Sequence, residues 1–168
     1  MKTLNFELVD EFAFGKIDRK EFLQLNDCVL NFSELIRLSL LCKISKNNRR
    51  FEVVLWHVPK SISQEEKEIF YRLLLLEDWH FFHEEIVQSF QELFNNNKEN
   101  ILAIKWAMER VPEYLSGFDL KTSYIRKCAY AIAAQPQPES IIALQELQTS
   151  EDEIISKQVT VQLSKLAM

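Results

Sequence analysis

The sequence predicts an all-α fold in which antiparallel helix pairs stack into a solenoid. Its 168 residues include only two glycines, whereas sandwiches, barrels and phosphate-binding loops need glycine at tight turns. The length suits a domain with a substantial core. A paired-helix unit also returns every 30 to 40 residues, and a period in this range is typical of helical repeats.

The first 47 residues are predicted to form a divergent helical cap. Residues 4–9 alternate loosely between apolar and polar, which fits either a short strand or a helical turn. Asp18 is placed to cap a short helix, and either Asn31 or Ser33 opens a second, largely apolar helix.

The stretch over residues 51–58 supports two interpretations. Its β-branched and aromatic content favours a strand. The spacing of Phe51, Leu55 and Val58 favours a helix instead, and Pro59 ends either element.

Two helix starts carry clear signals. Ser63 with Glu66 three residues later forms a capping box for a helix that runs to about residue 77. This helix is expected to bury Ile69, Phe70, Leu73, Leu74 and Leu76. Asp78 is expected to cap an amphipathic helix over residues 78–94.

The rest of the chain is divided by prolines and polar turns. Four further helices are predicted, over residues 101–108, 123–134, 141–147 and 154–166. The first of these ends before Pro112, and a loop with Gly117 as its pivot follows. Pro138 suits the first turn of the helix predicted over residues 141–147.

Apolar residues in the frame i, i+4, i+7 recur in successive helices. The matching sets are Phe51/Leu55/Val58, Ile86/Phe90/Leu93 and Ile125/Ala129/Ile132, with Ile155/Val159/Leu163 following loosely and Gln162 at its i+7 place. Their first members lie 35, 39 and 30 residues apart. One helix pair cannot bury such a stripe alone, but stacked pairs share a continuous core.

The run Ile125–Ala133 and the helix that follows at residues 138–147 resemble a HEAT repeat, with an aliphatic residue, Arg and small residues in the first helix. Residues 78–86 also resemble a segment of bacterial HEAT-like proteins. The resemblance covers residues 48–168, although Ser156 stands where the pattern has Arg. It implies one continuous right-handed α-solenoid of the armadillo type, and repeats of this kind are mostly interaction scaffolds.

Charge and composition narrow the classes of partner. The net charge is −5, and residues 61–100 carry three basic and nine acidic residues, hence −6. This balance disfavours nucleic acid, which needs a basic face, and it favours a basic protein partner.

The expected compartment is the cytoplasm. Cys28, Cys42 and Cys128 are odd in number and lie in apolar contexts, which fits reduced, buried thiols. The first residues lack the layout of a signal peptide, and no apolar run is long enough to span a membrane.

No reaction motif emerges, so no catalytic residue, cofactor or metal is expected. His80, His83 and Glu84 could share one face of a helix as metal ligands. Their order differs from that of the zinc peptidases, however, and no third strong ligand is near.

A solenoid usually binds its partner through the second helix of each pair. Residues predicted to bind a partner are Glu65, Glu68, Arg72, His83, Glu84, Glu85, Lys105 and Glu109. Gln145 is expected to be exposed as well, and Trp106 is either core, the favoured interpretation, or an interface anchor.

The expected function is a non-catalytic, monomeric protein-binding module. Small size and an acidic centre suggest an inhibitor of one basic partner, in the manner of an immunity protein that neutralises a toxin. The alternatives are a HEAT-like enzyme or lyase accessory that acts on a small ligand or modified base, and a structural subunit of a larger assembly.

Overall fold

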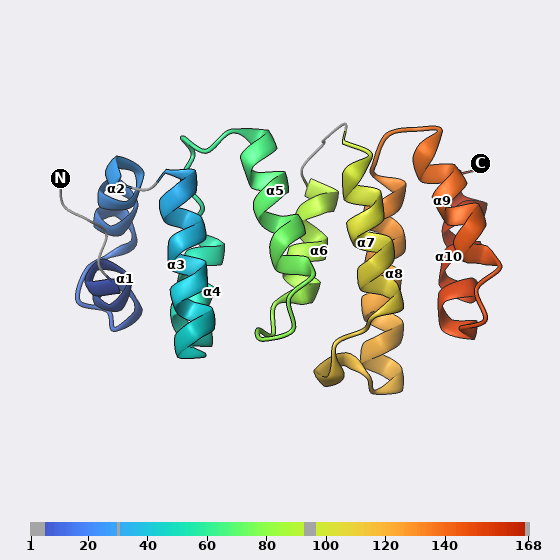
Figure 1. Cartoon of the computed structure of the whole chain (residues 1–168), viewed down its shortest axis with the longest axis horizontal. Helices are drawn as coiled ribbons and strands as arrows, with labels where there is room; N and C mark the ends of the chain where they lie inside the picture. The colour runs from blue at the N-terminus through green and yellow to red at the C-terminus, as the bar shows by residue number, and fades with distance from the viewer. Residues whose placement is uncertain (1–5, 30, 93–96, 167–168) are drawn as a thin grey trace. The chain divides into compact units, whose positions relative to one another are not determined.

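The protein is all-α in its computed structural model, which describes residues 6–29, 31–92 and 97–166. These residues form ten α-helices and one short 3-10 helix, and no strand occurs among them (Figure 1). The helices are α1 (Phe6–Ala13), α2 (Arg19–Val29), α3 (Phe32–Ser45), α4 (Asn48–Trp56), α5 (Gln64–Leu75), α6 (His83–Glu92), α7 (Glu99–Glu109), α8 (Phe118–Ala133), α9 (Glu139–Gln148) and α10 (Glu153–Leu166), with η1 (Glu113–Leu115) between α7 and α8.

The chain divides into two compact units. The first unit holds residues 1–70 and 79–81, and the second holds residues 71–78 and 82–168. The division falls within α5. It does not test the boundary predicted after residue 47, which stays a prediction.

In the first unit, α4 packs against both α1 and α3. The ambiguous stretch over residues 51–58 is therefore resolved as helix up to Trp56, and Phe51 and Leu55 are buried. The part of residues 4–9 that the structure describes is also helical, because α1 begins at Phe6.

Polar side chains begin the helices of the first unit largely where the sequence predicts. Asp18 Oδ1 accepts a hydrogen bond from the Glu21 N–H at 2.8 Å. Of the two candidates for α3, Asn31 is the cap, and its side chain accepts from the Glu34 N–H at 3.0 Å. These caps satisfy N–H groups that a first helical turn leaves without partners.

The capping box of α5 is confirmed. Ser63 Oγ accepts from the Glu66 N–H at 3.2 Å, and Glu66 Oε2 accepts from the Ser63 N–H at 2.9 Å. This reciprocal pair fixes the beginning of α5 at Gln64.

In the second unit, α8 packs against α6, α7, α9 and α10, and is therefore its central helix. Most members of the predicted frame that the structure describes are buried. Its buried members here are Ile86 and Phe90 of α6, Ile125, Ala129 and Ile132 of α8, and Ile155 and Val159 of α10. Leu93 lies outside the described residues, while Gln162 is buried and Leu163 is only half-buried.

A buried polar cluster joins several of these helices. Asn100 Nδ2 donates to Gln135 Oε1 at 3.1 Å, and Arg72 donates to Asn100 Oδ1 at 2.8 Å. Gln135 Nε2 in turn donates to the carbonyl oxygens of Phe90 and Ala131. The cluster satisfies amides that would otherwise be costly to bury.

The helix predicted over residues 78–94 begins later than expected. Asp78 is not its cap, since α6 begins at His83. The rings of Trp79 and His80 pack against Phe51, all within the first unit. These residues therefore contribute to the core of the first unit instead of to the first turn of α6.

Two further predictions near helix ends are wrong. α8 begins at Phe118 rather than near residue 123, with the extended Gly117 as its N-cap residue. Lys121, which was expected in a loop, therefore lies in α8, and its Nζ pairs with Asp152 Oδ2 at 2.5 Å. Leu73 and Leu76 were expected in the core but are exposed. The buried stripe of α5 runs instead through Phe70 and Leu74.

Two of the three cysteines are free, buried thiols, as predicted. Cys42 and Cys128 are fully buried, while the side chain of Cys28 lies outside the described part. Burial raises the pKa of Cys42 to about 12 and also raises that of Cys128. Neither thiol is therefore ionised at neutral pH.

No helix in the described part of the chain is long and apolar enough to cross a membrane.

Candidate functional site

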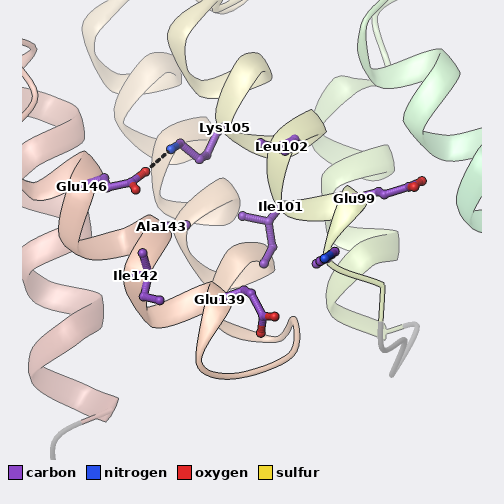
Figure 2. A pocket seen from close by; sticks show the side chains of 9 residues that line it. Glu99, Ile101, Leu102, Lys105, Glu139, Ile142, Ala143 and Glu146 are labelled. Atoms are coloured by element: carbon purple, nitrogen blue, oxygen red, sulfur yellow. Dashed lines mark hydrogen bonds and ion pairs between the residues drawn. The ribbon is translucent and has the colours of Figure 1, made fainter.

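A cavity of about 280 Å³ lies between α7 and α9 in the second unit (Figure 2). Ile101 and Ala143 line it and are buried, so they form its floor. Leu102 and Ile142 line it and are exposed, so they form its mouth. The cavity therefore offers apolar surface that solvent reaches.

The helical pattern explains why these apolar side chains face outward. The buried faces repeat at a spacing of 40 residues: Asn100, Ala103, Ile104 and Ala107 on α7, and Ser140, Ala143, Leu144 and Leu147 on α9. Leu102 and Ile142 lie off these faces, also 40 residues apart, with 69% and 49% of their surface exposed. The core does not require apolar residues at either place, and neighbouring exposed apolar side chains commonly mark a binding surface.

Charged side chains form the two edges of the cavity. Lys98 and Lys105 lie on the α7 edge, and Glu139 and Glu146 lie on the α9 edge. Lys105 Nζ and Glu146 Oε2 are 2.5 Å apart and close one end (Figure 2). At the other end, neither Lys98 nor Glu139 forms an ion pair with any residue that the structure describes.

Glu99 also lines the cavity but is engaged elsewhere. Its Oε2 lies 3.1 Å from the Arg72 guanidinium, and Figure 2 shows its side chain directed away from Ile142 and Glu146. The α7 edge is therefore basic in character, opposite an acidic α9 edge.

Trp106 extends the exposed surface of α7. The favoured interpretation as a core residue is wrong, because 44% of its surface is exposed. It lies one helical turn after Leu102, on the same side of α7. Its ring stacks on the Arg110 guanidinium at 3.6 Å, which holds the indole in place.

Among the predicted partner-binding residues, those of α5 and α7 have mixed outcomes. Glu65 and Glu109 are exposed, and Lys105 lines the cavity. Glu68 is buried, which corrects the expectation that it faces solvent. Arg72 is half-buried and holds Glu99 and Asn100, so it has a structural role.

The predicted residues of α6 are less available than expected. His83 is buried and Glu84 and Glu85 are half-buried. Glu84 Oε1 lies 3.1 Å from Lys127 Nζ, so its charge is already paired. The structure does not bring this segment to the cavity, whose lining comes from α7 and α9 together with Lys98.

His83 is held by hydrogen bonds inside the second unit. Its Nε2 lies 2.7 Å from the Glu77 carbonyl oxygen and therefore donates, while Nδ1 accepts from the Tyr114 hydroxyl at 3.1 Å. Burial raises the pKa of Tyr114 to about 12, so its hydroxyl stays protonated and can donate. The described residues contain no group of three or more ligating side chains that could hold a metal ion.

Comparisons with protein-family models, curated proteins and solved structures found no match to this chain.

Most of the cavity is not predicted from the sequence. Lys105 is among the predicted partner-binding residues, but Leu102, Ile142 and the edge residues Lys98 and Glu139 are not. The available signal was the position of each residue around its helix axis, because Leu102 and Ile142 are large apolar residues outside the buried stripe of their helices. That signal is clear only once the buried stripe itself is known.

Proposed function

We propose that this chain is a non-catalytic protein-binding module and that the surface of α7 and α9 contacts the partner. The supporting observation is the apolar cavity between these helices, with Leu102 and Ile142 exposed at its mouth. Its volume of about 280 Å³ is slightly below the roughly 300–1,000 Å³ of pockets that enclose drug-sized ligands. It suits side chains presented by another protein.

We further propose that the helices form HEAT-like repeats. The 40-residue spacing of the buried faces of α7 and α9 supports this, as does the 30-residue spacing from Ile125 to Ile155 on α8 and α10. In such an array the second helices of neighbouring pairs lie side by side. Under this proposal, the cavity lies on the surface where solenoids usually bind.

An inhibitor that neutralises a basic partner, such as a toxin, remains our proposal for the biological role. The net charge of −5 supports it. The exposed carboxylates Glu139 and Glu146 beside the cavity would receive basic side chains from such a partner.

The proposal is tested by selecting peptides that bind the purified chain and measuring their affinity for two variants. Leu102→Asp with Ile142→Asp places charges at the mouth of the cavity and is expected to weaken binding more than tenfold. Leu120→Asp with Val161→Asp is the matched control, since both residues are exposed apolar side chains of the second unit that do not line the cavity. Equal affinity for the cavity variant and the unchanged protein would overturn this assignment.

A further inference from the structure

The two edges of the cavity carry opposite charge in matching positions. Lys98, the N-cap residue of α7, and Lys105 on α7 are seven residues apart, and Glu139 and Glu146 are seven residues apart on α9. Seven residues correspond to about two turns and about 10.5 Å of helix. A partner segment lying along the cavity thus meets basic groups on one side and acidic groups on the other, at the same spacing. At one end Lys98 and Glu139 form no ion pair with a described residue, and at the other end the partner exchanges the exposed Lys105–Glu146 pair for its own charges.

We propose that the occupant is an amphipathic helix of a partner protein, with an apolar stripe between one acidic and one basic flank. This inference rests on the proposed function and names the chemistry of its partner. The apolar stripe lies over Leu102 and Ile142, the acidic flank faces Lys98 and Lys105, and the basic flank faces Glu139 and Glu146. Helices bound in grooves commonly use such anchors at i, i+4 and i+7.

The spacing of the edges favours a helix over an extended segment. A helix returns to the same face after seven residues, so one flank can meet both charges of an edge. An extended segment covers about 10.5 Å in about three residues. The two residues that would meet the charges of one edge are then three apart. Side chains alternate between faces along an extended segment, so these two would point in opposite directions.

The order of charges also fixes the direction of the bound helix. Turning the helix end for end while keeping its stripe on the cavity would place its acidic flank against the glutamates. Only one chain direction therefore satisfies both edges. A helix with two flanks of the same sign meets one repulsive edge in either direction.

The experiment uses synthetic helix-forming peptides that share one apolar stripe and differ in their flanks. The peptide with one acidic and one basic flank is expected to bind about tenfold more tightly than peptides with two acidic or two basic flanks. A nitroxide at its N-terminus should broaden amide signals near one end of the cavity. Exchanging the peptide's two flanks should move that broadening to the other end.

A variant of the protein supplies the matched test. Lys98→Glu, Lys105→Glu, Glu139→Lys and Glu146→Lys together exchange the edges, conserve the net charge and allow the ion pair at positions 105 and 146 to form in reverse. The original peptide should bind this variant in the opposite direction. If the variant does not fold, the flank-exchanged peptide on the unchanged protein still decides the question.

The outcomes separate this inference from the proposed function. Equal affinity for all flanks, or a direction that no exchange reverses, would overturn the charge-ordered helix. Another contrary result is an extended peptide that binds the unchanged protein but not the variant with Leu102→Asp and Ile142→Asp. That result would leave the proposed function standing and overturn the charge-ordered helix. Self-association in sedimentation, abolished by the same pair of substitutions, would identify a second copy of this chain as the occupant and would also overturn it.

Discussion

Lys105 Nζ lies 2.5 Å from Glu146 Oε2 and joins α7 to α9 at one end of the apolar cavity. The Lys105 side chain is 22% exposed, whereas that of Glu146 is 60% exposed. Water therefore screens the pair on the glutamate side. The contact positions the two edges of the cavity more than it stabilises the fold.

A double-mutant cycle with Lys105→Met and Glu146→Gln should return a small coupling energy. Exposed ion pairs typically contribute about 0.2–1 kcal/mol, and salt weakens them. Chemical unfolding of the four proteins at low and high salt measures the coupling. A value above about 2 kcal/mol that persists at high salt would contradict this account.

The pair of Asp10 and Arg50 should make the first unit sensitive to acid. Two hydrogen bonds of 2.7 Å and 2.6 Å join the guanidinium to the carboxylate, and they hold the pKa of Asp10 below its usual value. Asp10 is then ionised more readily in the folded than in the unfolded state. Its stabilisation is present above about pH 4 and is lost as the pH falls through its lowered folded-state pKa.

Asp10→Asn should therefore lower the free energy of unfolding by about 1–2 kcal/mol near neutral pH. The difference from the unchanged protein should shrink below about pH 4. Denaturant unfolding across this pH range measures it, with Glu11→Gln on the exposed side of α1 as control. A difference independent of pH would contradict the role given to the ion pair.

Local chemistry was the most predictable part of the fold. Ser63 with Glu66, and Asn31 before α3, act through side chains and N–H groups a few residues apart, so the sequence is enough to recognise them. Residues 79–82, by contrast, lie before α6, and Trp79 and His80 pack against Phe51, about 30 residues earlier in the chain. Such long-range packing has no local signature.

The site was less predictable than the fold because it depends on which helix faces remain uncovered. Lys105 could be named as a residue of a second helix. Glu68 and His83 look like surface residues by type, yet tertiary packing buries both. The exposure of Leu102 and Ile142 likewise follows from which neighbouring helices cover α7 and α9.

Gln135→Ala should destabilise the second unit by about 1–3 kcal/mol, because it leaves the buried Asn100 amide and the Phe90 carbonyl oxygen without this partner. Thermal or denaturant unfolding measures the loss. Gln145→Ala, at an exposed position of α9, is the control and should change stability by less than about 0.5 kcal/mol. Equal effects of the two substitutions would show that the cluster does not stabilise the fold.

Glu84→Lys and Glu85→Lys should differ, although both reverse a charge in the first turn of α6. Glu84→Lys places two lysines together, since Glu84 Oε1 lies 3.1 Å from Lys127 Nζ. It should cost about 1 kcal/mol more than Glu85→Lys in the free energy of unfolding. Adding Lys127→Glu should recover most of the loss in Glu84→Lys, and failure to do so would contradict the pairing.

Gln162→Leu should stabilise the protein. Gln162 is buried in α10, and its Oε1 has no hydrogen-bond partner among the described residues. Ile132 occupies the corresponding place in α8, 30 residues earlier, and is also buried. A buried oxygen without a partner costs about 1–3 kcal/mol, and leucine removes that cost at a similar side-chain length.

The expected gain is about 1 kcal/mol in the free energy of unfolding, since part of the benefit is spent on repacking. Denaturant unfolding measures it, with Gln145→Leu as the matched substitution at an exposed position. If Gln162→Leu raises the free energy of unfolding and Gln145→Leu does not, an apolar residue at the buried frame position stabilises α10. Added hydrophobicity alone would not explain that difference. A loss of stability in Gln162→Leu would instead show that the amide is held by polar contacts and that this position has left the apolar frame shared by α8 and α10.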